Sequence, residues 1–169
     1  MEVQEALLKR RSVRKFTEEA VSEEDVSALL HAAMSGPSAC NTRPWMFYVV
    51  TNAELLEKLS GATKFSHIKA PMAIIVAGSR SRMLPMQLAD FWVQDCSAAT
   101  ENILLRAVEL GLGTVWCGVY PQKTAVKKVS EILGLPSKHI PLNIIYVGHG
   151  AEEPVARDQF TDKCICYLR

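Results

Sequence analysis

The longest helical pattern in this 169-residue chain is also its most apolar, and it limits the fold more than any other feature. The pattern covers residues 86 to 111 and includes the run AATENILLRAVELG. A helix that is apolar on several sides has to be covered by other elements. The sequence therefore predicts a central helix packed among the remaining apolar segments.

Four short runs predict strands, of which the first two are expected to be buried and the last to be central. They are WMFYVVT at 45–51, PMAIIVAG at 71–78, TVWCGV at 114–119 and PLNIIYVGHG at 141–150. Further helices are predicted at 2–9, from the N-cap Ser22 to Gly36-Pro37, at 53–60 and at 122–133. Strands and helices mix within one domain, residues 1–169, which predicts an α+β fold without giving the order of the strands.

Composition narrows the class of protein. Formal net charge is +1 and apolar residues make up 49%, so a full core is expected and a surface built to hold nucleic acid is not. The start MEVQEALLKR does not have the form of a signal peptide, and the apolar runs are too short to cross a bilayer. Five cysteines and four scattered histidines predict free thiols and no metal site. We expect a cytoplasmic protein that binds neither membrane nor nucleic acid.

A local basic cluster, KRRSVRKF at 9–16, stands out against this balanced charge. In an extended segment, Arg10, Ser12 and Arg14 would share one face, and the residues between them would face the other way. Two guanidinium groups and a hydroxyl suit a phosphate dianion or a planar acceptor edge. A solvated basic turn and a nucleic-acid contact are the alternatives.

Two loops carry weaker signals. In GPSACNTRPW, at 36–45, Ser38 and Asn41 could donate hydrogen bonds to a ligand or could bond the local backbone. In GLGTVWCG, at 111–118, the glycines follow a helix and precede a strand, which is the wrong order for a dinucleotide-binding turn. Gly111 or Gly113 is expected to cap the helix, whereas Gly118 ends a strand where backbone could approach a ligand.

Together these stretches resemble the FMN-dependent nitroreductase family along nearly the whole chain and in the usual order. The similarity lies in RRSVRKF, in AAMSGPSACNTRPWMFYVV, in AATENILLRAVELGLGTVWCGVY and in IPLNIIYVGHGAEEPVAR. The sequence departs from the family pattern at Arg43, where glutamine is usual, at Val155, where a basic residue is common, and at Cys117. The segment 79–88 is also too short to form a long substrate lid.

The resemblance implies a nitroreductase-like fold with a mixed or antiparallel central sheet flanked by helices. It also implies a homodimer with FMN sites at the interface. The residues carried over to the phosphate and ribityl side of FMN are Arg10, Arg11, Ser12 and Arg157, with Arg14 at the pyrimidine edge. Those that would lie beside the flavin ring are Cys117 and Gly118. Those that would reach the flavin from the partner chain are Pro37, Ser38, Ala39 and Asn41.

The implied activity is a ping-pong oxidoreductase reaction. NADH or NADPH reduces the flavin, which then reduces an electron-poor acceptor such as a nitroaromatic or a quinone. No side chain of this chain is expected to act as a catalytic acid or base. The alternatives are a dimeric FMN-binding or storage module and a flavin enzyme of the same fold with another reaction, such as dehalogenation, azoline oxidation or flavin fragmentation.

Overall fold

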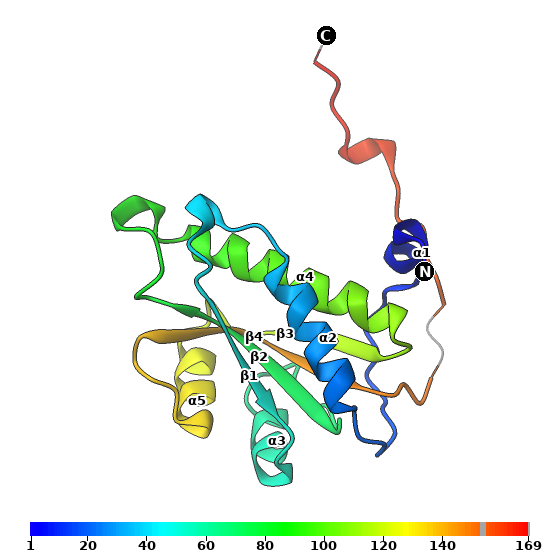
Figure 1. Cartoon of the computed structure of the whole chain (residues 1–169), viewed down its shortest axis with the longest axis horizontal. Helices are drawn as coiled ribbons and strands as arrows, with labels where there is room; N and C mark the ends of the chain where they lie inside the picture. Colours follow the sequence, from blue (N-terminus) through cyan, green and yellow to red (C-terminus); the bar gives the residue numbers. More distant parts are fainter. Residues whose placement is uncertain (153–154, 169) are drawn as a thin grey trace.

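A computed structural model describes residues 1–152 and 155–168 of the chain; positions 153 and 154 of the GAEEPVAR segment lie outside the described residues. Its centre is a four-stranded sheet in the order β1-β2-β4-β3, with every neighbouring pair antiparallel (Figure 1). The strands are β1 (Trp45–Val50), β2 (Met72–Ser79), β3 (Gly113–Gly118) and β4 (His139–Gly148). The predicted α+β class is confirmed, and of the two sheet types expected the antiparallel one is present.

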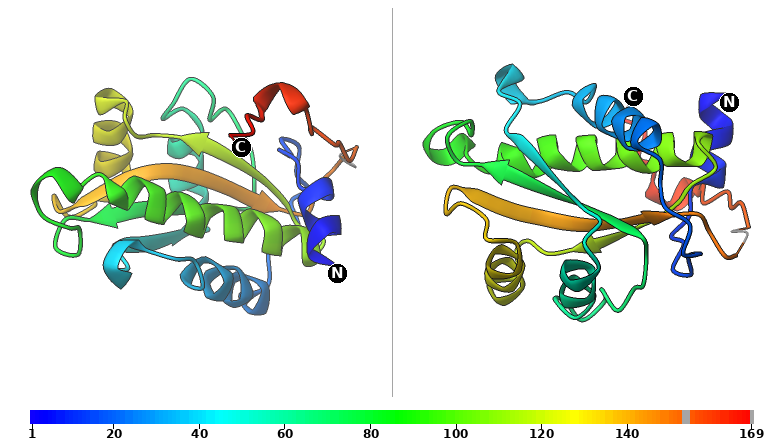
Figure 2. Two further views of the ribbon diagram at one scale, coloured as in Figure 1. Left: turned by 90° about the horizontal axis from the view of Figure 1, so that it is seen from above. Right: turned by 60° about the horizontal axis from the view of Figure 1, so that its bottom comes forward.

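Helices cover both faces of this sheet, as the two views of Figure 2 show. The helices are α1 (Val3–Lys9), α2 (Glu23–Met34), α3 (Ala53–Ser60), α4 (Phe91–Glu109) and α5 (Lys123–Leu133). Short 3-10 turns lie at η1 (Ala39–Asn41), η2 (Met86–Leu88) and η3 (Asp162–Cys164). Helices α2 and α4 bury one face of β2 through Ile74 and Val76, while α3 and α5 bury the other through Ala73 and Ile75. Alternation along a strand separates these two sets, because successive side chains point to opposite faces.

Helix α4 is central, as the sequence predicts, but it is shorter than the predicted 86–111. Residues 86 to 88 form η2 instead, since Met86 has a positive φ of 50° directly after Pro85. From Phe91 onward, one stripe of α4 that includes Cys96, Ala99 and Ile103 is fully buried. Within the described part of the chain, no helix, α4 included, has both the length and the apolar character needed to cross a bilayer.

Two glycines at the end of α4 have different tasks. Gly111 has a positive φ of 73° and its N–H donates to the Val108 carbonyl, so it ends the helix as predicted. Gly113 instead begins β3. A Cβ atom on Gly113 would lie 2.8 Å from Cγ1 of Val13. Gly113 is therefore needed for the close approach of the N-terminal segment, and it is not a helix cap.

The N-terminal segment 10–17 lies against the end of the sheet in an extended conformation. Ser12 forms a parallel bridge with Thr114, and Phe16 forms an antiparallel bridge with Gly150. The N–H of Val13 donates to the Thr114 carbonyl at 2.9 Å. Val13 is only 3% exposed, which anchors the segment to the core and fixes the direction of the side chains around it.

Candidate functional site

The extended segment places four predicted site residues around one cavity of about 430 Å³. We call this cavity the arginine pocket. Its lining residues are Arg10, Arg11, Ser12, Arg14, Glu152, Val155, Arg157 and Gln159. The basic cluster near the N-terminus thus meets Arg157 from the C-terminal tail, although more than 140 residues of sequence separate them.

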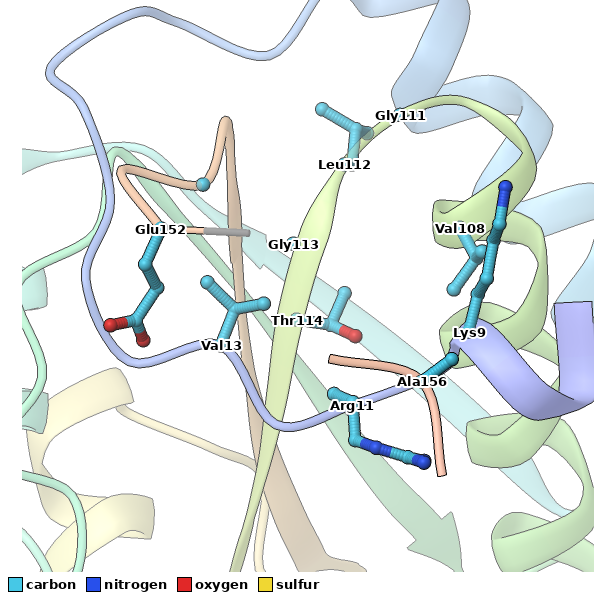
Figure 3. Close-up of a pocket in the computed structure, with 11 residues that line it drawn as sticks. Lys9, Arg11, Val13, Val108, Gly111, Leu112, Gly113, Thr114, Glu152 and Ala156 are labelled. Carbon is cyan, nitrogen blue, oxygen red and sulfur yellow. The ribbon is translucent and has the colours of Figure 1, made fainter. Parts of the chain in front are cut away.

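A second cavity, of about 530 Å³, lies on the other side of the same segment. Figure 3 shows Lys9, Arg11 and Val13 around it, with Thr114 on β3 and Glu152 nearby. The even-numbered side chains of segment 10–14 therefore face the arginine pocket, and the odd-numbered ones face the second cavity, as alternation predicts. Arg11 is long enough to reach both.

Arg11 ties the tail to the basic segment. Its Nε donates to the Val155 carbonyl at 3.0 Å, and its Nη1 donates to the Arg10 carbonyl at 2.7 Å. Its Nη2 is buried and has no hydrogen-bond partner. A buried guanidinium N–H without a partner costs free energy, so this atom marks a place where a bound acceptor would be favourable.

Positive charge dominates the arginine pocket, because four guanidinium groups face one carboxylate, that of Glu152. Arg10 has a distant partner, with its Nε 3.6 Å from Oε1 of Glu101. The carboxylate of Glu152 accepts a long hydrogen bond, 3.5 Å, from the backbone N–H of Arg14. Among the described residues, neither Arg14 nor Arg157 forms an ion pair. This excess of guanidinium donors and the orphaned Nη2 of Arg11 fit the phosphate dianion of FMN.

Strand β3 leads from this pocket along the open edge of the sheet. The Thr114 carbonyl faces Val13, and the Val119 N–H donates inward to the Leu142 carbonyl. Alternation then directs the N–H of Gly118 outward and that of Cys117 towards β4. A Cβ built on Gly118 would meet no atom within 4 Å. The space beside Gly118 is therefore open, and a planar ring could approach the backbone there.

Cys117 points into the layer formed by α3 and α5. Its Sγ donates to the Phe65 carbonyl at 3.4 Å. Burial raises the pKa of the Cys117 thiol to about 11, although the nearby Arg14 opposes this effect. The side chain is therefore a protonated packing group at neutral pH, and not a thiolate.

The four residues expected to reach a flavin from the partner chain do not line the arginine pocket. They lie in the loop of η1, beside the N-terminal half of α4, where the Ala39 N–H donates to Oδ1 of the buried Asp95 at 2.8 Å (Figure 1). Arg43 organises this loop: its N–H donates to Ser38 Oγ, and its Nε donates to Asn41 Oδ1 at 2.8 Å. One chain alone therefore leaves the predicted site in two separate parts.

Sequence reasoning missed Glu152, Gln159 and the bond from Arg43 to Asn41. Glu152 belongs to the IPLNIIYVGHGAEEPVAR stretch that carries the family resemblance, and nothing in its spacing indicates that it turns towards the arginines. The hydrogen bond of Arg43 forms where Asn41 and Arg43 both have positive φ angles, of 54° and 47°. Asparagine favours this conformation, but nothing about the arginine at position 43 indicates it.

Comparison with known proteins agrees with this fold. The family model described as "Nitroreductase family" matches residues 7–73 and 65–149. A relative from Methanothermobacter thermautotrophicus, provisionally named NADH dehydrogenase/NAD(P)H nitroreductase, is 45% identical over 162 residues, which cover 95% of this chain and 83% of that protein. The chain belongs to the nitroreductase family.

Solved structures show the same architecture. A protein of the same provisional name from Parabacteroides distasonis superposes with a TM-score of 0.92 at 33% identity, covering 98% of this chain and 96% of that one. A provisionally assigned nitroreductase from Desulfovibrio desulfuricans, solved in complex with FMN, superposes with a TM-score of 0.84 at 29% identity. The coverage there is 100% of this chain and 98% of that one.

Proposed function

We propose that this chain is an FMN-dependent oxidoreductase that takes hydride from NADH or NADPH and reduces an electron-poor acceptor of the nitroaromatic or quinone type. The observation that carries the proposal is the arginine pocket, where Arg10, Arg11, Arg14 and Arg157 surround one cavity next to the open edge of β3. The names of the similar proteins, which include an FMN reductase of Bacillus subtilis at 25% identity, support the same chemistry.

Each part of the site has a task in this proposal. Arg10, Arg157 and the Ser12 hydroxyl hold the phosphate and ribityl side of FMN, while Arg11 keeps the tail in place and turns its free Nη2 towards the anion. Arg14 lies at the pyrimidine edge, where a fixed positive charge favours the reduced cofactor. The N–H of Gly118 faces the ring. Bound FMN supplies the hydride chemistry, and the protein supplies binding, orientation and charge.

A homodimer completes the site in the proposal, with Pro37, Ser38, Ala39 and Asn41 reaching the cofactor of the partner. The separation of these residues from the arginine pocket within one chain supports this arrangement. Apolar side chains near both ends of the chain also lack cover: Val3 in α1 is 73% exposed, and Phe160 and Leu168 in the tail are 73% and 93% exposed. A homodimer interface, which is more apolar than the rest of a protein surface, would cover groups of this kind. We place the protein in the cytoplasm, in agreement with its free thiols.

The visible spectrum of the purified protein, before and after NADPH is added without oxygen, tests the proposal. We expect a bound flavin band that bleaches with NADPH and returns when a quinone is added. A protein that stays colourless after incubation with FMN would rule the proposal out. A protein that binds FMN but oxidises NADPH no faster than free flavin does would instead be a storage module.

A further inference from the structure

One end of the sheet gathers positive charge that the arginine pocket does not use. Strands β1 and β4 begin at this end of the sheet, and strands β2 and β3 finish there. The pairing shows this, because Trp45 lies opposite Gly78, Ser79 opposite His139 and Gly118 opposite Asn143. The adjoining loops lie at the left-hand end of the sheet in the right view of Figure 2. They bring together five exposed cations, which we call the cationic rim: Arg43, Arg80, Arg82, Lys123 and Lys138.

The rim is basic because its segments contain no acidic residue at all. Residues 36–50, 79–89, 118–130 and 134–148 include neither aspartate nor glutamate, although the whole chain has 18 acidic residues against 19 basic ones. None of the five rim cations forms an ion pair with a described residue. Two of them also act on His139, whose pKa is lowered first by partial burial and then by the charges of Lys138 and Arg82.

A cavity of about 350 Å³ lies within the rim. Arg80, Lys123 and His139 line it together with the hydroxyl-bearing Ser130 and Ser137. Lys127 also lines it, but Nζ of Lys127 already lies 3.7 Å from Oε1 of Glu131. No carboxylate lines this cavity. Backbone contacts hold its walls, because the Arg80 N–H donates to the Lys138 carbonyl at 2.8 Å. Cations, hydroxyls and a concave shape are the features that recognise a phosphate ester.

Strand β3 connects this cavity to the proposed cofactor site. It begins beside the arginine pocket at Gly113 and ends at Gly118, and six residues of strand span about 20 Å. Beyond Gly118 the chain runs through Tyr120, which lines the rim cavity, to Lys123. A donor whose nicotinamide ring stacks beside Gly118 would thus extend its phosphate-bearing half towards the rim.

We propose that the cationic rim binds the adenosine phosphates of the electron donor and that the chain prefers NADPH to NADH. The inference rests on the proposed function. The difference between the two donors is the 2′-phosphate of NADPH, a dianion at neutral pH. Arg80 and Lys123 are the residues that bind it, because both line the cavity and neither is neutralised by a carboxylate.

The test uses full-length protein and two readouts at one fixed ionic strength. The first is the dissociation constant of 2′,5′-ADP, which carries the 2′-phosphate and needs no flavin chemistry. The second is kcat/KM for NADPH and for NADH. Arg80→Gln and Lys123→Gln should each weaken 2′,5′-ADP binding about tenfold and lower the NADPH/NADH ratio of kcat/KM by a similar factor. Arg80→Lys, which keeps the charge, should retain most of the 2′,5′-ADP affinity and most of the NADPH/NADH ratio of kcat/KM.

The control is Lys58→Gln, which removes an exposed lysine on α3 that is not part of the rim. It should change neither readout. The inference is overturned if Arg80→Gln and Lys123→Gln leave both readouts unchanged, or if equimolar inorganic phosphate displaces 2′,5′-ADP from the wild type. A protein that oxidises neither donor but binds 2′,5′-ADP through these two residues would overturn the proposed function and keep the phosphate site.

Discussion

Arg14, like Arg157, forms no ion pair with a described residue, and unlike Arg157 it belongs to the anchored segment 10–17. It is exposed, and no described residue accepts a hydrogen bond from its guanidinium group or pairs with it. Arg11, by contrast, donates hydrogen bonds from Nε and Nη1 to two backbone carbonyls. An arginine kept without protein partners beside an open cavity is available to a ligand, which makes Arg14 the cleanest single-residue test of the cofactor site.

We expect Arg14→Gln to weaken FMN binding about tenfold, the loss that follows when one charged hydrogen bond is removed. Fluorescence titration of the apoprotein with FMN measures it. The thermal midpoint of the apoprotein should stay unchanged, because the side chain makes no contact that holds the fold. Lys15→Gln is the matched control, since the neighbouring side chain points to the other face of the segment. Equal affinity in Arg14→Gln and wild type would remove Arg14 from the site.

Two buried thiols give the protein a characteristic response to alkaline pH. Burial raises the pKa of Cys117 to about 11 and that of Cys96 to about 12, whereas a thiol in the unfolded chain titrates near 8.5 to 9. Between these values the unfolded chain loses protons that the folded chain retains. The free energy of unfolding should therefore fall as pH rises from about 9 through 11.

Urea unfolding at pH 8 and pH 10.5 checks this response. Cys117→Ala has a lower free energy of unfolding at both pH values because it loses packing, but its decrease between them should be smaller than that of the wild type. An equal decrease in both proteins would mean that Cys117 does not titrate with a raised pKa. The difference between the two decreases isolates Cys117, because the lysines and tyrosines that also titrate in this range are the same in both proteins.

At the scale of elements, the join between segment 10–17 and the β3 strand positions the arginines. The Val13 side chain packs directly against Gly113, and the Val13 N–H donates to the Thr114 carbonyl. The position of the neighbouring basic side chains therefore depends on the absence of a side chain at residue 113. We expect Gly113→Ala to lower the free energy of unfolding by about 1–3 kcal/mol through overpacking. FMN affinity should fall with it, because Arg10, Ser12 and Arg14 shift together.

Urea unfolding of Gly113→Ala measures its free energy of unfolding, and titration with FMN measures its affinity for the cofactor. Gly61→Ala is the control: it adds the same methyl group where no atom lies within 4 Å. If Gly113→Ala keeps both the stability and the FMN affinity of the wild type, the packing of Val13 does not set the position of the arginines.

The elements themselves were largely readable from the sequence. Helix α3 has the predicted bounds, and Ser22 caps α2 by accepting from the Asp25 N–H. The predicted start of α4 at residue 86 was wrong. The apolar pattern continues through 86–88, but the backbone at Met86 has a positive φ and is not α-helical there. Periodicity reports which side chains are buried, but a single residue with positive φ can break a helix without changing that pattern.

At the scale of the whole molecule, the site depends on contacts that sequence spacing does not encode. Alternation predicted correctly that Arg10, Ser12 and Arg14 share a face. It could not show that Glu152 and Arg157 come to the same cavity, because their position follows from the path of the tail and from the hydrogen bond between Arg11 and Val155. The strand order that creates the cationic rim was equally hidden, since it joins loops from four distant parts of the chain.

The division of the proposed site between two chains has a direct test by complementation. Arg14→Ala removes a residue of the arginine pocket, and Asn41→Ala removes one from the η1 loop, so each homodimer should bind FMN weakly at both of its sites. In a mixed dimer, a site built across the interface takes its pocket from one chain and its loop from the other. One of the two sites is then wild type, and the other lacks both residues.

Mixing the two variants under conditions that exchange subunits should therefore restore one tight FMN site in each mixed dimer, or about one per four chains at statistical exchange. Differently tagged chains and tandem purification isolate that dimer, and absorbance of bound flavin counts the sites. Each variant mixed with itself is the control and should show no tight FMN site. If Arg14 and Asn41 instead act within one chain, every site in the mixed dimer lacks one of them, and no tight binding returns. Recovery would thus assign the loop to the partner's cofactor without a structure of the dimer.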